Sequence, residues 1–552
     1  MSLEAAAEAD TGASAGGAVL LVLAAGQFLM TLDMSVMNVS IANVAHDLGT
    51  TVSGVQTAIT LYTLVMAMFM VTGGKLGGIF GRRRACMAGC VVYACGSLTT
   101  ALAPNLGVLI IGWSVLEGLG AVLIMPAIVA LVAGNFAPAG RPRAYGLIAS
   151  AGAIAVAVGP LIGGLVTTYA SWRWVFVGEV VVVIAIFFMA RGLADPDPPA
   201  RTPLDLVGIV LSALGLGFFV FGVLRTSSWG WLLAKPGAPS LFGLSASAWL
   251  MFGGALVVLG FLAWERRRLD RGAPVLVDPS LLRNRQLMGG LSVFSFQFLL
   301  QAGLFFIVPL FLTVALGLTA LDTGVRLLPL SITLLVAAVG VPRLWPHASP
   351  RRVVRFGLVA LLAGIVTLLA ALEAGVGPEV TTVPLLLAGL GIGALASQLG
   401  AVTVSAVPED RSPEVGGLQN TFMNLGASLG TALAGSVLLA SLTTTFLTGI
   451  ANNPAVPSDL SSQATTTLAA GVPFVSDAQL RQALDRAQVP PTTADAVVAE
   501  NTTARIRSLR LALGVLGVIA VLSLFFTGAI PDRQPGLSRD DGDGDTTAAD
   551  QR

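Results

Sequence analysis

Long apolar runs separated by short polar breaks dominate the pattern of hydrophobic and polar positions in this chain. A run of about 20 apolar residues is long enough to cross the ~30 Å hydrocarbon core of a bilayer as a helix. The pattern predicts fourteen such helices, at 18–41, 55–76, 84–103, 106–134, 143–168, 174–191, 206–225, 247–264, 287–314, 321–345, 353–372, 383–407, 414–442 and 508–530. The predicted fold class is therefore all-α, a polytopic membrane protein.

Composition supports this interpretation and excludes several other classes of protein. Of the 552 residues, 55% are hydrophobic and 11% charged, whereas soluble chains carry about 25% charged residues. The net charge of +1 gives no reason to expect a nucleic-acid partner. The sequence offers no phosphate-binding loop and no convincing nucleophile–base set, so neither an enzyme nor a cofactor is expected. Cys86, Cys90 and Cys95 share one apolar segment, where packing explains them better than a metal site.

Arginine is concentrated in every second predicted loop, and this asymmetry sets the expected orientation in the cytoplasmic membrane. The loops assigned to the cytoplasm contain Arg82, Arg83 and Arg84; Arg141 and Arg143; Arg201; Arg266, Arg267, Arg268, Arg271, Arg283 and Arg285; Arg351 and Arg352; and Arg411. An even number of helices places both termini on the cytoplasmic side. Residues 1–17 and 531–552 are predicted to be disordered cytoplasmic tails.

A weak internal repeat divides the chain into two related halves. Pro138-Ala-Gly-Arg141, followed by Gly159, resembles Pro408-Glu-Asp-Arg411, followed by Gly430. The fifth predicted helix therefore matches the thirteenth. This offset of eight gives a first six-helix bundle at 18–191, two inserted helices with their linkers at 192–286, and a second bundle at 287–530. Two such halves are typical of a transporter with a site at their interface.

The predicted extracellular loop 443–507 is much longer than the others. It contains two helix-like stretches, for which Ser476 and Thr492 are candidate N-caps. We expect an unstructured insertion here, and the alternative is a small lid or a docking site for a partner.

The first predicted helix contains a single acid near its middle. Asp33 is the only charge between Ala18 and Ile41, and a carboxylate at that depth costs on the order of 3 kcal/mol on insertion scales. Such an acid usually faces a cavity or a partner, although it can also be a protonated or hydrogen-bonded residue without a role in transport. Glu117 and Glu179 are two more acids inside predicted spans.

These two glutamates allow two interpretations. Acids that titrate in a low-dielectric site can carry protons. The alternative is an ion pair with a buried arginine, for which Arg225 and Arg326 are candidates. Together, Asp33, Glu117 and Glu179 form the predicted proton-coupling set.

The loop after the second helix reads Gly74-Lys-Leu-Gly-Gly-Ile-Phe-Gly81-Arg82-Arg83-Arg84. It resembles the loop signature of the major facilitator superfamily, G-x-L-x-D-x-x-G-R-[RK]. Gly74, Leu76, Gly81, Arg82 and Arg83 match. The aspartate of the motif is Gly78 here, which puts gating through this loop in doubt.

The fifth helix contains a second motif, built from Gly152, Gly159, Pro160, Gly163 and Gly164. Small residues four apart allow a neighbouring helix to approach closely, and the proline permits a kink. The pattern resembles the G-P-x-x-G-G motif of the superfamily's antiporters. That resemblance implies exchange transport and a bendable interface between the halves.

Two further stretches resemble the fourteen-helix drug/proton antiporter branch of this superfamily. Leu32-Asp33-Met-Ser-Val-Met-Asn38-Val is similar to its L-D-x-T-x-V-N-V signature, and Trp172-Arg-Trp-Val-Phe176 to its W-R-W-x-F signature. The chain departs from the branch in the fourth helix, where Ser114 and Glu117 occupy positions usually held by Arg and Gln. It departs again where Glu179 replaces a polar residue.

Several other residues in the predicted spans could line a substrate pocket. They are Met30, Met37, Asn38, Gln297, Gln301, Gln398, Asn420 and Asn424. Methionine suits varied apolar ligands, although each methionine is individually more typical of core packing and each amide of a bond between helices.

The sequence thus predicts a monomeric, proton-coupled antiporter that exports small amphipathic or cationic compounds such as drugs. One alternative is export of an endogenous metabolite, lipid or self-made antibiotic by the same mechanism. Another is a membrane receptor or scaffold that acts through the 443–507 loop.

Overall fold

The computed structural model describes residues 3–136, 141–195, 203–235, 237–345, 347–373, 375–407, 412–468 and 472–532. Arg201, Arg411, the loop parts of both repeat motifs and residues 533–552 lie outside these ranges. The two-stranded β1–β2 hairpin is the one sheet within them, and the rest is helical, which confirms the all-α fold class.

The N-terminal half contains the helices that the first six apolar runs predict. They are α1 (Leu3–Asp47), α2 (Val52–Phe80), α3 (Arg82–Ala101), a fourth helix made of α4 (Leu106–Leu109), η1 (Ile110–Glu117) and α5 (Gly118–Asn135), then α6 (Arg141–Tyr169) and α7 (Arg173–Ala190). Thr51 and Asn105 cap α2 and α4 through their side chains. Gly81 has φ +98°, a conformation that favours glycine and permits the tight turn from α2 to α3.

Two inserted helices and the C-terminal half follow. The inserted pair is α8 (Leu206–Trp229) and α9 (Ala246–Asp270), joined through β1 (Ser240–Leu241) and β2 (Leu244–Ser245). The remaining elements are η3 (Leu281–Arg283), α10 (Arg285–Leu310), η4 (Phe311–Ala315), α11 (Ala320–Leu344), α12 (Pro350–Ala371), η5 (Pro378–Thr381), α13 (Thr382–Val404), α14 (Ser412–Asn452), α15 (Ser458–Thr467), α16 (Asp477–Arg486), α17 (Pro491–Phe526) and η7 (Thr527–Ala529).

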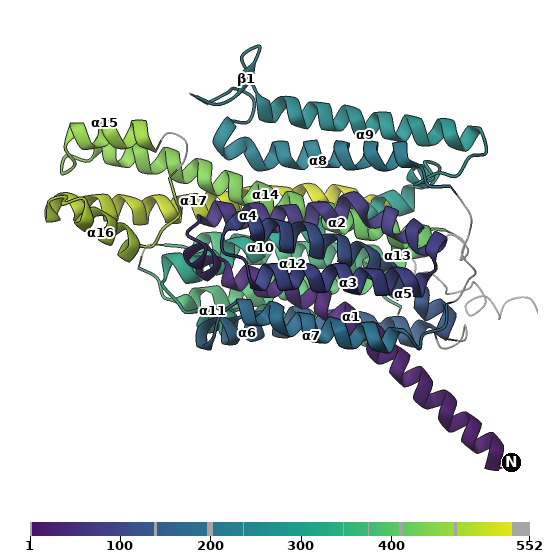
Figure 1. Cartoon of the computed structure of the whole chain (residues 1–552). Coiled ribbons are helices and arrows are strands. Elements are labelled where there is room, and N and C mark those ends of the chain that lie inside the picture. The colour runs from purple at the N-terminus through teal and green to yellow at the C-terminus, as the bar shows by residue number, and fades with distance from the viewer. Residues whose placement is uncertain are drawn as a thin grey trace, which may run out of the picture.

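Thirteen helices of the described chain are long and apolar enough to cross a membrane. The one predicted helix that is not among these thirteen is the third, α3. It begins with three arginines and is therefore less apolar, yet it packs between α5 and α7. The structure is thus consistent with fourteen spans. The α8–α9 pair lies along one side of the bundle, where α8 packs on α2 and α14 (Figure 1).

Helix contacts follow the symmetry that the sequence repeat implies. Within the halves, α1 packs on α6 and α10 packs on α14; between the halves, α6 packs on α11 and α2 on α14. Gly159 of α6 lies against Ser35, and Gly430 of α14 lies against Leu299 of α10. A Cβ at Gly430 would lie 2.1 Å from the Leu299 carbonyl oxygen, so only glycine permits this approach.

Two expectations about flexible segments were wrong. The N-terminal segment expected as a disordered tail is helical from Leu3, and it continues α1 beyond the bundle (Figure 1). The loop 443–507 is a packed unit rather than an unstructured insertion, because α14 has 41 residues, about 60 Å, and therefore extends past a ~30 Å bilayer core. We call the unit formed by the outer ends of α14 and α17 together with α15 and α16 the helical cap (Figure 1).

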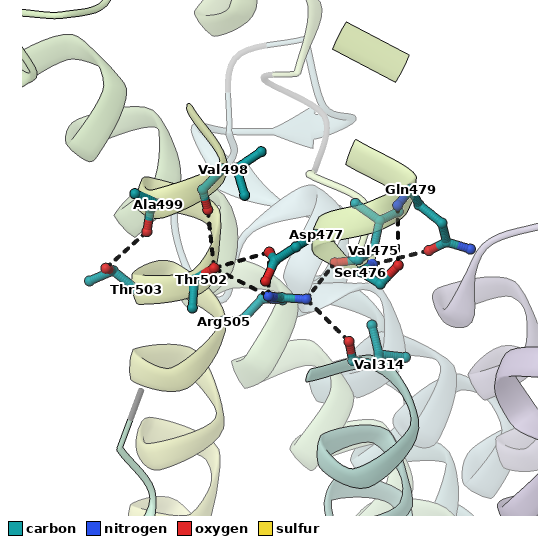
Figure 2. A network of polar contacts seen from close by, with 10 residues as sticks. All are labelled: Val314, Val475, Ser476, Asp477, Gln479, Val498, Ala499, Thr502, Thr503 and Arg505. Carbon is teal, nitrogen blue, oxygen red and sulfur yellow. Dashed lines mark hydrogen bonds and ion pairs between the residues drawn. The ribbon is translucent and has the colours of Figure 1, made fainter. Parts of the chain in front are cut away.

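The helical cap has its own apolar core and a buried arginine. Phe446, Val456, Phe474 and Val497 are buried in it. Arg505 of α17 is 1% exposed and donates to the carbonyl oxygens of Val314 (3.2 Å) and Val475 (3.0 Å) and to Asp477 (2.5 Å), as Figure 2 shows. Since Val314 lies in η4, this one side chain connects the helical cap to the end of α10.

One of the two predicted caps in this segment is confirmed. Ser476 caps α16 and forms a reciprocal capping box with Gln479 (Figure 2). The prediction for Thr492 was wrong, because α17 begins at Pro491, a residue whose fixed φ suits the first helical position.

Replacing Arg505 with methionine should therefore loosen the helical cap. The substitution leaves two carbonyl oxygens without their donor and removes the charged partner of Asp477, which is half-exposed and keeps the Thr502 hydroxyl. We expect a loss of about 1–3 kcal/mol, the scale for buried polar groups left without a partner. The readout is the apparent melting temperature of the purified protein. Arg481→Met is the control, because Arg481 and its partner Asp495 are exposed and their pair is worth less than about 1 kcal/mol. Equal melting temperatures for the two variants would contradict the structural role of Arg505.

Candidate functional site

Three carboxylates from three different helices meet inside the N-terminal half. Asp33 of α1, Glu117 at the end of η1 and Glu179 of α7 each offer an oxygen within 4.8 Å of the others. Their exposed fractions are 0%, 0% and 2%. The predicted proton-coupling residues are therefore gathered at one place, which we call the acid cluster.

Aromatic and hydroxyl donors surround the acid cluster. The indole Nε1 of Trp113 donates to both oxygens of Asp33, at 2.9 and 3.0 Å. Tyr62 of α2 stacks on that indole, with ring centroids 5.0 Å apart and planes 7° from parallel. The stack fixes the indole and hence the direction of its N–H toward Asp33.

The two glutamates receive hydroxyl donors from α3. Tyr93 (3.3 Å) and Ser97 (3.2 Å) donate to Oε2 of Glu179, and Thr100 donates to Oε1 of Glu117 (3.1 Å). The other oxygen of each glutamate has no hydrogen-bond donor. Each carboxyl therefore retains an oxygen on which a proton can reside.

No basic side chain of the described residues forms an ion pair with the acid cluster. The candidate Arg225 instead stacks on Phe221 and Trp229 of α8, and Arg326 makes no ion pair with either glutamate. Carboxylates this close cannot all be ionised in an apolar surrounding, because like charges repel strongly there. The cluster must therefore share protons or hold a cation, and its oxygen-only donor set would suit a hard cation as well.

The fourth helix owes its part in the site to a stretch of π-helix. Residues Ile110–Glu117 adopt this wider winding, which is often found at functional sites. It keeps Trp113 and Glu117 both fully buried, while Ser114 donates to the Ala58 carbonyl of α2 (2.8 Å). A Cβ at Gly96 of α3 would lie 2.6 Å from Glu117 Cγ, so glycine there allows α3 to approach the cluster.

The opposite face of α1 lies at the interface between the halves. Ser35, Asn38 and Val39 line a small cavity there with Pro160, Phe305, Pro309 and Leu327. Its volume of about 10 Å³ is close to that of a single water site. Asp33 does not line this cavity; α1 thus carries the acid on one face and the interfacial cavity on the other.

The predicted substrate-pocket residues are not gathered around one cavity in this conformation. Asn38 lines the interfacial cavity, whereas Met30 and Met37 are packed in the core of the N-terminal half. Asn420 and Asn424 donate to carbonyl oxygens of their own helix α14. The remaining three are glutamines: Gln297 is buried and Gln301 half-buried in α10, and Gln398 is buried in α13.

The glycine motif of α6 faces two neighbours at once. Gly152, Gly159 and Gly163 contact α1, at Gln27, Ser35 and Val36 respectively. Gly164 lies against the backbone of Ala320 in α11, and the Pro160 carbonyl oxygen lies against Gly324 of the same helix. Thus α6 connects the helix that carries Asp33 to the other half of the molecule.

The loop signature of α2 and α3 makes contacts within the N-terminal half. Arg82 donates to the Gly74 carbonyl (2.8 Å), and Arg83 to the carbonyls of Arg191 and Leu193 at the end of α7. Asp195 accepts from the backbone amides of Arg82 and Arg83. Gly78 lies beside the Arg82 guanidinium, where the aspartate of the signature would stand.

Comparison with known proteins decides the family. Residues 23–431 match the profile described as Major Facilitator Superfamily. The chain belongs to this superfamily. Relatives include the "Tetracenomycin C resistance and export protein" of Streptomyces glaucescens, 30% identical over 76% of each chain, and the "Probable actinorhodin transporter" of Streptomyces coelicolor, 29% identical over 77% of this chain and 73% of the relative.

Solved structures agree on the fold. A bacterial homologue of the human lysosomal transporter Spinster, in an inward-facing, unoccupied conformation, has a TM-score of 0.57 at 15% identity and covers 94% of this chain and 98% of that chain. The protein is therefore a polytopic membrane transporter, as the sequence predicted.

Sequence reasoning missed the donors that hold this transporter's acid cluster. The donors Trp113, Tyr93, Ser97 and Thr100, and Tyr62, which stacks on Trp113, come from helices whose relative rotation the sequence does not give. One signal was present: Trp113 precedes Glu117 by four residues, so the two share a helix face in an otherwise aliphatic stretch.

Adding a methyl group at Gly96 should disturb the acid cluster. Gly96→Ala forces Glu117 and the η1 backbone to move, and overpacking of this kind costs about 1–3 kcal/mol. The matched control is Gly178→Ala in α7, where an added Cβ meets nothing within 4 Å and helix propensity favours alanine. We expect a lower apparent melting temperature for Gly96→Ala and an unchanged or higher one for Gly178→Ala. A Gly96→Ala variant as stable as the control would show that α3 does not press on Glu117.

Proposed function

We propose that this transporter exports small amphipathic or cationic compounds, antibiotics and other drugs among them, in exchange for protons. The observation that carries the proposal is the acid cluster, three buried carboxyls that no basic side chain of the described ranges pairs with. Such a group can gain and lose protons and changes its net charge when it does. The names of the relatives support the cargo class.

The coupling acts through α1 rather than by direct contact of cargo and acid. Asp33 lies on the face of α1 toward the acid cluster, while Ser35 and Asn38 lie on the face toward the other half. A change in protonation alters the repulsion among α1, η1 and α7 and so favours one packing of α1 over another. Cargo at the interface favours the other packing, and this difference in affinity is what an exchange mechanism requires.

The halves then move against each other at two contacts. The α6–α11 contact includes the hydrogen bond from the Leu321 amide to Thr168 (3.0 Å). The α2–α14 contact includes Gln56 donating to the Thr431 carbonyl (3.0 Å) and Ser428 to the Thr60 carbonyl (3.1 Å). Opening one end of the bundle requires these few bonds to break, which fits the rocking of two rigid repeats.

A self-made antibiotic is the second candidate cargo. The tetracenomycin and actinorhodin relatives are named for compounds of this kind. Both candidates use the same residues, so an export screen with a panel of cations and polycyclic antibiotics, with and without a proton uncoupler, separates them.

Asp33→Asn should abolish proton coupling while preserving the volume of the side chain. In proteoliposomes, we expect cargo uptake driven by an imposed pH gradient to fall by at least about tenfold, the scale of a coupling free energy of 1–3 kcal/mol. Asp459→Asn, an exposed residue of α15, is the control and should transport normally. A parallel arm replaces the proton gradient with a sodium gradient. Undiminished cargo-driven proton flux in Asp33→Asn would remove Asp33 from the mechanism, and uptake driven by sodium alone would replace the proton as coupling ion.

Removal of α15 and α16 tests the receptor or scaffold alternative. Thr493 bonds the Ala455 carbonyl (3.2 Å), so a short Gly-Ser link from Ala455 to Pro491 can replace residues 456–490 without separating α14 from α17. We expect the shortened protein to retain uptake in the same assay, because the acid cluster and the interfacial cavity lie outside the deleted segment. Because the deletion removes Val475 and Asp477, two partners of Arg505, a lower melting temperature is expected. Loss of all uptake in a shortened protein that still shows a cooperative melting transition would assign the working part to the helical cap.

A further inference from the structure

The connection between α8 and α9 is a well-ordered hairpin with an unusual tip. Strands β1 and β2 pair Ser240 with Ser245 and Leu241 with Leu244, leaving Phe242 and Gly243 as the two turn residues. Ser245 donates to the carbonyls of Gly230 and Trp231 and caps α9. The hairpin is therefore held at its base by hydrogen bonds to the end of α8.

The tip places an aromatic residue where the backbone disfavours it. Phe242 has φ +53° and Gly243 has φ +77°. A two-residue turn with both φ values positive is usually Asn-Gly, because a bulky side chain is strained in this region. The Phe242 side chain is also 87% exposed, more than any other large hydrophobic residue of the described chain. In water, a phenylalanine at this position would be unfavourable for two reasons: its backbone is strained, and its apolar side chain is exposed.

The rest of the hairpin surface is apolar as well. Trp231, Leu232, Leu233 and Leu241 are between 43% and 71% exposed. The one charge between residues 231 and 245 is Lys235, whose Nζ donates back to the Ser227 carbonyl of α8 (2.6 Å). The hairpin thus has the surface of a membrane-contacting segment rather than of an aqueous loop.

The exposed surface continues into the lipid-facing side of α9. Trp249 and Phe252 of α9 follow Phe242 in an edge-to-face series, with centroids 6.4 and 6.5 Å apart, and the Trp249 indole donates to the Leu241 carbonyl. In the apolar 18-residue stretch of α9, only 17% of the residues are buried. Figure 1 shows the hairpin projecting sideways from the α8–α9 pair, across the direction of the helices and near the end of the molecule that carries the helical cap.

We propose that this hairpin is a lipid anchor, which inserts Phe242 and its apolar neighbours into the interfacial layer of the bilayer leaflet on the side of the helical cap. Aromatic side chains favour that layer, and a lipid surface accommodates the exposed apolar tip without a protein partner. The anchor fixes the outer end of the inserted pair, which otherwise contacts the bundle mainly through α8. This inference requires that the protein spans the membrane but not that it is coupled to protons.

Site-directed spin labelling in liposomes tests the proposal. In a background with Cys86→Ala, Cys90→Ala and Cys95→Ser, a nitroxide is attached at Leu241→Cys and, as an aqueous control, at Asp459→Cys in the helical cap. Collision with oxygen, which concentrates in lipid, is compared with collision with a water-soluble nickel chelate. We expect the label at 241 to favour oxygen by severalfold relative to the label at 459.

The substitution Phe242→Asn provides a matched variant. Asparagine suits the positive φ of the turn, so the hairpin should persist while its apolar tip is lost. We expect collision of the label at 241 with the nickel chelate to rise in this variant. Equal nickel accessibility of positions 241 and 459 in liposomes would overturn the proposal. Protection of the label at 241 by a second protein copy would overturn it as well. In that case, the protection would disappear when the lipid-to-protein ratio is raised.

Discussion

Three buried carboxyls, which have no basic neighbour within the described part of the chain, impose the constraint on which the N-terminal half depends. Two carboxylates about 4 Å apart repel by roughly 4 kcal/mol at an effective dielectric constant near 20, a large fraction of the stability of an ordinary domain. The donors Trp113, Tyr93, Ser97 and Thr100 solvate the acid cluster but cannot neutralise it. The packing of α1, η1, α3 and α7 is therefore compatible with only some charge states of the cluster. The binding of protons or of a cation to the acid cluster is therefore linked to helix packing in one equilibrium.

That equilibrium reaches the other half through closely packed backbone. Gly159 and Gly163 bring α6 against Ser35 and Val36 of α1, and Gly164 brings the same helix against Ala320 of α11. Because the glycines contribute no side chain to these contacts, little flexible structure lies between the helices to absorb a displacement, since protein interiors are close-packed. A small movement of α1 must therefore shift α6 or break the α6–α11 contact. The glycine motif thus serves two interfaces, one within a half and one between the halves.

The sequence was most informative where a single physical rule applies. A membrane span needs about 20 apolar residues, so the helices could be predicted. A charge within such a span is costly, so Asp33, Glu117 and Glu179 could be singled out. Their meeting at one place could not be derived, because it depends on helix rotation and on the π-helical turns before Glu117. The contacts of the predicted pocket residues could not be derived either: Asn420 and Asn424 bond their own helix, a local alternative that residue type does not reveal.

The repeat shows that the chemistry is confined to one half of the molecule. Gly159 contacts Ser35 and its counterpart Gly430 contacts Leu299, so the position two residues before Ser35, Asp33, corresponds to Gln297. Gln297 is 2% exposed but neutral. Among the described residues, the only buried charge of the C-terminal half is Arg505. It lies in the helical cap, on α17, and not beside Gln297 of α10. A symmetric pair of acids would respond to protons in both halves and could not distinguish one from the other. In the exchange proposed above, protonation changes the charge of the acid cluster, while the corresponding position in the C-terminal half, Gln297, stays neutral. That asymmetry would give the movement of the halves a direction.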